Sequence, residues 1–309
     1  MVKRLISTNS SEVLAMNGAE LKQSIKASEG RVILSENVVL HEVGDGITTS
    51  ELAAAFGADL ILLNGLDVLN PAIIGLYPGE DTKDTVKVHH DGKSIQRLQT
   101  LVGRPIGVNL EPVDPHADMA ETRLIIPEGR MASVKTLTEI ERLGFNFVCL
   151  TGNPGTGVTN AQIAANIKVA KSAFSGLVIA GKMHGAGVNE PVVSLEATQA
   201  FIDAGVDVLL VPAVGTVPGL DEDELKQIVR LAHANNVLVM STIGTSQESS
   251  GHAYIEQIAI KNKIIGVDIQ HVGDAAWSVQ SPFENLYAMS RAIRGDRHAL
   301  QRMARSINR

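Results

Sequence analysis

The chain has 309 residues, of which 44% are hydrophobic, 20% are charged and 3% are aromatic, the composition of a globular protein with a core of aliphatic side chains. Its formal net charge of −7 excludes a general binder of nucleic acids or of anionic membranes, because both need a positive surface. The single cysteine, Cys149, lies in an apolar run and excludes a disulfide framework and a cysteine-rich metal site.

The first residues, 1–30, are predicted to form a helical extension that plugs the bottom of the fold. Its helical stretch is SEVLAMNGAELKQSIKASEG. The beginning, MVKRLISTNSSEV, lacks the apolar core of a signal peptide. No run in the chain approaches the roughly 20 apolar residues of a membrane span. The expected location is therefore the cytoplasm.

Eight short apolar runs follow, and each is predicted to be a buried parallel strand. They cover residues 32–39, 59–64, 105–111, 145–151, 176–182, 206–212, 236–242 and 263–269. Helical segments separate them, and a unit of about 30 residues repeated eight times is typical of a (β/α)8 TIM barrel. We predict an α/β fold with one domain over 1–309, in which the barrel covers 32–280. An open doubly wound sheet is the alternative.

Three further segments stand outside the repeat. Two insertions after the second and third strands, residues 70–92 and 112–131, are candidate lids because loops after strands lie on the catalytic face. Residues 281–309 are predicted to be helical and basic. Their basic residues with a spacing of three to four are Arg291, Arg294, His298, Arg302, Arg305 and Arg309. We interpret this face as a subunit contact in a homo-oligomer or as a clamp on the barrel bottom, in preference to a nucleic-acid stripe.

The glycine-rich stretch TGNPGTGVTN, residues 151–160, follows the fourth strand. It is not a Walker loop, since Val158 stands where the lysine is needed, and Asn160 breaks a dinucleotide-binding pattern. The loop still lies on the face where such barrels bind ligands. Gly155 and Thr156 are therefore predicted to contact a ligand, and a purely structural turn remains the alternative.

The loops after the seventh and eighth strands are the usual phosphate pocket of TIM barrels. Here they read STIGTSQESSG and QHVGDAAWS. Backbone amides and hydroxyls predict a phosphate-like anion at Gly244, Thr245, Ser246 and Gly273. The neighbouring Asp274 opposes this, because a carboxylate repels phosphate unless a cation intervenes. Two ordinary glycine turns are the alternative.

The fifth strand ends in AGKMHGAG, where Lys182 and His184 are predicted to point to one face of an extended backbone. Lys182 can act as a Schiff-base amine or as a fixed cation, or it can form a structural ion pair. His184 can act in acid–base chemistry or be an already hydrogen-bonded supporting residue.

Carboxylates and amides are predicted at the tips of other strands. Glu36 belongs to the first strand, Asn64 and Glu111 end the second and third, and Asp268, Gln270 and His271 belong to the eighth. Such groups can form an acid–base pair or an oxygen-ligand site for a divalent metal. No zinc motif is present, so no dedicated metal ligand is predicted, and magnesium is the metal that these ligands would suit.

Two stretches carry a resemblance to known barrels. VDVLLVPAVGTVPGLDEDELKQI is similar to the sixth-strand region of BtpA-like TIM barrels. The ending VGDAAWSVQSPFENLYAMSRAIRGDRHALQRMARSINR resembles a bacterial TIM-barrel family whose members are called phosphoenolpyruvate phosphonomutase-like or haloacid-dehalogenase-like. The motifs E-D-K-x-x-x-K-x-C and D-x-D-x-[TV] of those two enzyme groups are absent. The resemblance therefore implies a phosphate-compatible barrel without indicating a reaction.

Together these patterns favour a TIM-barrel enzyme that acts on a small anionic, phosphorylated metabolite by lyase or isomerase chemistry. Lys182 would act with a strand-tip carboxylate, Glu111 or Glu36. A metal-dependent lyase of the phosphonomutase type is one alternative. The other is a barrel without catalysis that binds a metabolite or builds an assembly.

Overall fold

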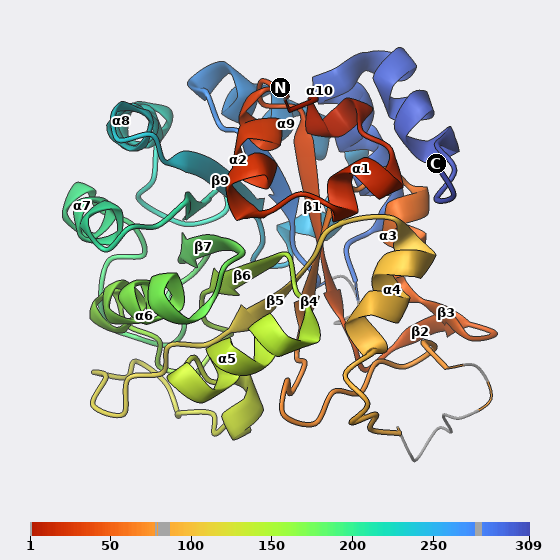
Figure 1. Ribbon diagram of the computed structural model, residues 1–309. Helices are drawn as coiled ribbons and strands as arrows, with labels where there is room; N and C mark the ends of the chain where they lie inside the picture. Colours follow the sequence, from red (N-terminus) through yellow and green to blue (C-terminus); the bar gives the residue numbers. More distant parts are fainter. Residues whose placement is uncertain (1, 78, 80–86, 276–279) are drawn as a thin grey trace.

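A computed structural model describes residues 2–77, 79, 87–275 and 280–309 (Figure 1). Its eight parallel strands close into a barrel in the order β1-β10-β9-β8-β7-β6-β5-β4. The bounds are Val32–Val38 for β1, Leu60–Asn64 for β4, Ile106–Leu110 for β5, Phe147–Leu150 for β6, Leu177–Gly181 for β7, Val208–Pro212 for β8, Leu238–Ile243 for β9 and Ile269–Val272 for β10. The predicted (β/α)8 barrel is confirmed.

Helices alternate with the strands and form the outer layer. They are α3 (Thr49–Ala55), α4 (Ser94–Val102), α5 (Val134–Leu143), α6 (Asn160–Ala173), α7 (Leu195–Asp203), α8 (Glu222–Ala234), α9 (His252–Ile265) and α10 (Phe283–Ala304), with short 3-10 helices η2 (Glu128–Arg130) and η3 (Gln247–Ser249). A small hairpin, β2 (Glu42–Gly44) with β3 (Ile47–Thr48), follows β1. No helix in the described part of the chain is long and apolar enough to cross a membrane.

The predicted start of the last strand is wrong. The apolar run at 263–269 predicts a strand throughout, but α9 continues to Ile265 and ends at Gly266, whose φ of 111° is a left-handed conformation suited to glycine. The strand β10 begins only at Ile269. A short apolar run cannot distinguish the end of a buried helix from a strand, which is why the boundary differs.

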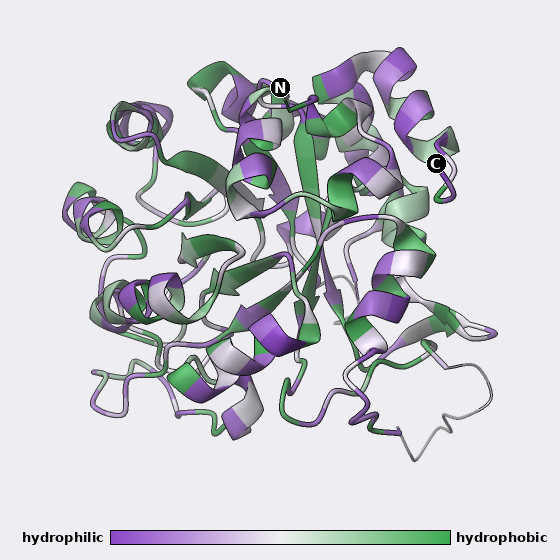
Figure 2. Ribbon diagram, in the orientation of Figure 1, coloured by the Kyte–Doolittle hydropathy of each residue, from purple (hydrophilic) through white to green (hydrophobic). Residues whose placement is uncertain are grey.

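The strands alternate between two apolar layers. One layer, between strands and helices, includes Ile33, Ile61 and Val178, while the barrel interior includes Leu34, Leu62 and Ile179. Figure 2 shows the resulting hydrophobic strands at the centre of the fold. At the carboxyl ends of the strands the inward positions become polar, with Glu36, Asn64, Asn109 and His271. The interior is therefore a packed core below a polar mouth.

The N-terminal extension contributes to this interior. It forms η1 (Leu5–Ser7), α1 (Ser10–Leu14) and α2 (Gly18–Lys26), because Asn17 caps a second helix where one helical segment was expected. Leu5, Val13, Leu21 and Ile25 are buried in one cluster with the interior side chains of the barrel. Figure 1 shows α1 and α2 at the end of the barrel where the N-terminus lies. These contacts agree with the predicted plug.

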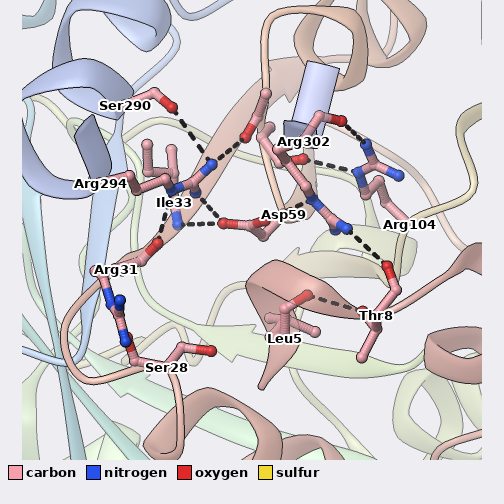
Figure 3. A network of polar contacts seen from close by, with 12 residues as sticks. Leu5, Thr8, Ser28, Arg31, Ile33, Asp59, Arg104, Ser290, Arg294 and Arg302 are labelled. Atoms are coloured by element: carbon pink, nitrogen blue, oxygen red, sulfur yellow. Dashed lines mark hydrogen bonds and ion pairs between the residues drawn. The ribbon is translucent and has the colours of Figure 1, made fainter. Parts of the chain in front are cut away.

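A buried charge cluster joins α10 to the same end of the barrel (Figure 3). Asp59, just before β4, contacts Arg294 and lies 2.7 Å from Nε of Arg302, and all three side chains are at most 1% exposed. Arg104 donates to the carbonyl oxygens of Ala58, Gly103 and Arg302. Two residues of the predicted basic face thus bind the barrel bottom, as the clamp interpretation required. Another, Arg291, is exposed and pairs with Asp296.

Candidate active site

A cavity of about 150 Å³ opens among the carboxyl ends of the strands. Its lining includes many of the predicted residues, namely Glu36, Asn64, His184, Gly244, Thr245, Ser246 and Gly273. It also includes residues that the sequence did not single out as ligand contacts, namely Asn109, Asn153, Glu248 and Asp274. An engineered cavity of about this volume admits benzene. The mouth therefore has room for a ligand of about six non-hydrogen atoms in this conformation.

Three carboxyl groups line the cavity. Burial raises the pKa of Glu36 to about 8, with further contributions from the charges of Glu248 and Glu111. Burial and the charge of Glu36 raise the pKa of Asp274 to about 7. The pKa of Glu248 is also raised, again chiefly by burial. Carboxyls with such pKa values hold or release a proton near neutral pH, as a general acid or base must.

Two imidazoles stand beside these carboxyls in neutral form. Burial lowers the pKa of His271 to about 4, and burial together with the charge of Lys182 lowers the pKa of His184. His271 Nε2 lies 3.2 Å from Glu36 Oε2 without the angle of a hydrogen bond. His184 Nδ1 accepts a hydrogen bond from the Ala186 amide at 3.0 Å, so its remaining proton is on Nε2. His184 is thus a hydrogen-bond donor on the cavity wall.

A hydrogen-bonded network fixes the carboxylate side of the mouth. Asn64 Nδ2 donates to Asp274 at 3.0 Å and to Asn153 Oδ1 at 3.0 Å. Asn153 donates in turn to Glu111 through its amide group and its backbone N–H. Glu111 does not line the cavity and pairs with Arg130 at 2.6 Å. Glu111 therefore holds Asn153 in place and does not itself face the cavity.

Lys182 lies away from the cavity. Its buried ammonium pairs with Glu190 at 2.5 Å, and burial lowers its pKa while Glu190 raises it. Its partner is thus neither Glu111 nor Glu36, the carboxylates with which it was predicted to act, and it does not share the cavity wall with His184. The strand ends at Gly181, and Lys182 follows the outward alternation of Val178 and Ala180 in the helix-facing layer. The structure thus has the ion pair that was the alternative for this lysine.

The glycine-rich loop 151–160 reaches the cavity through Gly152, Asn153 and Pro154. Gly155 and Thr156, the predicted contacts, do not line it. The Gly155 carbonyl accepts from the Leu124 amide at 2.7 Å, and Thr156 Oγ1 donates to the Asn153 carbonyl at 2.8 Å. The loop therefore faces the cavity at its start, and in its second half it is bound by the insertion after β5.

The two candidate lids are described to different extents. The insertion 112–131 is held by backbone bonds to the loops after β6 and β7, including Ala120 N to Gly187 O at 2.8 Å. In the insertion 70–92, residues 78 and 80–86 lie outside the described residues, as do residues 276–279 of the loop after β10. The lid function of both segments stays a prediction.

Magnesium is the metal that the strand-tip ligands would suit. Among the described residues, no group of three or more His, Cys, Asp or Glu side chains is arranged to hold a metal ion. Asp268, one of the candidate carboxylates, pairs with His233 at 2.8 Å, and its Oδ2 accepts from the Val239 amide.

The raised carboxyl pKa values predict that stability falls with rising pH. Stability from Glu36 and Asp274 is fully present below their ordinary values of 4.5 and 3.8 and is lost as pH rises through about 8 and 7. His271 acts oppositely, but only below its ordinary value of 6.5. The free energy of unfolding, measured with urea, should therefore fall between pH 6.5 and 8 by up to about 1.4 kcal/mol per pH unit for each carboxyl. Glu36→Gln should flatten this slope, and a stability that rises over the interval would contradict the assignment.

Comparison with known families gives one match over nearly the whole chain. A family model described as "Domain of unknown function (DUF7916)" matches residues 6–309. No curated protein matches the chain. The family description names no reaction, so any proposal about the chemistry must be argued from the residues of the site.

Solved structures similar to this one are TIM barrels. An archaeal fructose 1,6-bisphosphate aldolase has 15% identity and a TM-score of 0.52, covering 86% of this chain and 95% of its own. An archaeal fructose-1,6-bisphosphate aldolase with its catalytic lysine bound to the carbinolamine intermediate of the substrate has 15% identity, a TM-score of 0.51 and the same coverage of both chains. A 2,3-dimethylmalate lyase of the PEP mutase/isocitrate lyase superfamily has 14% identity and a TM-score of 0.47, and the match covers 87% of this chain and 82% of the lyase. Likeness at these identities shows the fold alone.

Proposed function

The chain belongs to the family described as Domain of unknown function (DUF7916), and we propose that it is an enzyme that moves protons on a small metabolite at the barrel mouth. The observation that carries the proposal is that two carboxyls, the buried Glu36 and the half-buried Asp274, line one small cavity. Isomerases and many lyases begin by removing a proton next to a carbonyl, and such a pair of groups suits that step.

The two carboxyls have different roles in this proposal. Asp274, with a pKa of about 7, is half ionised at neutral pH and takes the proton from carbon. Glu36, with a pKa of about 8, remains mostly protonated and donates to the substrate oxygen on which charge develops. The Nε2–H of His184 is a second donor for that oxygen. Both charges cannot develop freely side by side, which keeps one proton in the pair.

An anionic or phosphorylated substrate is the second candidate. It is favoured by the turn at Gly244, Thr245 and Ser246, which lines the cavity. Thr245 and Ser246 hold φ angles of 58° and 67°, a strained conformation that often marks functional turns. Because carboxyls share this cavity, an anion would enter together with protons. Its affinity should then fall as pH rises above neutral.

Exchange with solvent tests the proposed proton transfer even though the substrate is unidentified. The protein is incubated in D2O with keto acids, hydroxy acids, amino acids and amino ketones of three to five carbons. Loss of the proton signal next to the carbonyl is followed by NMR. Exchange in at least one compound above the buffer rate is expected. If no compound exchanges, proton abstraction at this mouth is refuted.

Lys182 is expected to support the fold and to be dispensable for exchange. Lys182→Ala leaves Glu190 without its cation, and since Glu190 is 24% exposed the loss should be about 2 kcal/mol, below that of a fully buried pair. Lys182→Met keeps the aliphatic stem and separates packing from charge. Urea unfolding and the exchange rate are measured on both variants. Loss of exchange with unchanged stability would instead identify Lys182 as a functional amine.

A further inference from the structure

The orientation of one amide at the mouth is fixed by the backbone. Asn64 Oδ1 accepts from the Gly65 N–H at 2.8 Å, so this atom must be the oxygen. Asn109 lies 3.2 Å from it and therefore presents its Nδ2. The Asn109 oxygen is consequently turned away from Asn64. Asn109 is 4% exposed and lines the cavity.

Two acceptor oxygens of the cavity residues are left without a donor. Asn109 Oδ1 has no hydrogen-bond partner among the described residues, and neither has Glu248 Oε2. Glu248 is 1% exposed, and its other oxygen accepts from the Ala275 amide at 2.7 Å. A buried acceptor without a donor destabilises the protein, so a ligand that brings donors removes this cost.

The charge of the lining residues also favours a ligand that brings hydrogen-bond donors. Glu36, Glu248 and Asp274 are its ionisable acids, and the described lining residues include no lysine or arginine. His184 is neutral there. A cation therefore complements the charge that these carboxyls carry when ionised and favours their ionised form, whereas an anion favours their protonated form.

We propose that the cavity binds a small protonated amine, whose N–H groups and any neighbouring hydroxyl supply the donors that Asn109 Oδ1 and Glu248 Oε2 lack. This inference rests on the proposed function in taking the cavity as the substrate site. It replaces a purely anionic substrate by one that carries an ammonium group at the end that enters the barrel. The turn at Gly244, which is predicted to bind an anion, then remains available to the other end of the molecule.

A matched set of small probes tests the charge requirement. 1-Amino-2-propanol, propane-1,2-diol and lactate have similar sizes and fit a cavity of this volume, and inorganic phosphate is the fourth probe. For so few atoms, dissociation constants of about a millimolar are expected, within reach of calorimetry. The amine should bind at least about ten-fold more tightly than the diol, a difference of about 1.4 kcal/mol. Stronger binding of lactate or phosphate, equal binding of the diol, or no binding of the amine overturns the proposal.

Glu248→Gln is the diagnostic variant. The Ala275 N–H requires an acceptor, so the new amide nitrogen takes the place of Oε2 and presents a donor to the cavity. Amine affinity should fall at least about ten-fold, while thermal unfolding verifies the fold. Asp296→Asn makes a comparable change at an exposed position of α10 and should bind like the wild type. A folded Glu248→Gln protein with wild-type affinity for the amine refutes the proposed contact.

The two proposals fail separately. Binding of the amine without deuterium exchange in any compound leaves the amine site standing and refutes the enzyme. Exchange in keto or hydroxy acids together with no binding of 1-amino-2-propanol leaves the enzyme standing and refutes the amine site.

Discussion

Asp59→Asn should lower the free energy of unfolding by about 3–5 kcal/mol, the usual loss when one partner of a buried ion pair is removed. Arg294 and Arg302 would keep their charges in an environment that is at most 1% exposed. The carboxylate also accepts the Ile33 N–H at 2.9 Å, so the strand β1 loses part of its anchor. Urea unfolding measures the free energy, and the melting temperature should fall by about 10 °C.

The control for this variant is Asp296→Asn. Asp296 pairs with Arg291, and their side chains are 63% and 51% exposed. Exposed pairs contribute about 0–1 kcal/mol, so this variant should unfold like the wild type. If Asp59→Asn is as stable as Asp296→Asn, the buried cluster does not hold α10 on the barrel in the way we describe.

Glu36→Gln and Asp274→Asn should each reduce deuterium exchange by about 10²–10⁴-fold, the contribution of a positioned acid or base. Neither change should unfold the protein. Gln stays neutral at every pH, whereas Glu36 with its pKa of about 8 is half ionised in the buried site at pH 8, so Glu36→Gln should be at least as stable as the wild type there. The rate is followed by NMR on whichever compound exchanges in the wild-type protein.

Two outcomes would reject these catalytic roles. One is an exchange rate that both variants share with the wild type. The other is a rate lost only in variants that also lose their fold. Asp296→Asn, far from the mouth on α10, provides the matched change from Asp to Asn.

The barrel could be predicted because its signal is repeated along the whole chain. Each strand is a run of apolar residues, and a helix of matching length separates it from the next, so one misplaced boundary at 263–269 left the architecture intact. The polar residues that face inward near the strand ends could be predicted from the sequence equally well. Glu36 and Asn64 continue the alternation of Leu34 and Leu62, and both line the cavity.

Loop residues could not be placed in the same way. Asn153 reaches the cavity from a loop and Glu248 from the short helix η3, and strand alternation gives no direction in either place. Lys182 still follows the outward alternation of Val178 and Ala180, but His184, which lies beyond the end of the strand at Gly181, does not, and it lines the cavity. The partner of Lys182, Glu190, lies in a loop, and no sequence pattern pairs the two. The amide of Asn64 at a strand end, followed directly by Gly65, is the one sequence feature that could have indicated the hydrogen-bonded network at the mouth.

The cluster around Asp59 also determines when the barrel can be completed. Asp59 and Arg294 are separated by 235 positions in the chain, and α10 follows all eight strands. A growing chain therefore presents Asp59 to water and to chaperones throughout the synthesis of the barrel wall. Contacts of such long sequence separation form late because loop closure must be overcome first. A ribosome stalled before α10 would thus hold all eight strands while Asp59 still lacks Arg294 and Arg302.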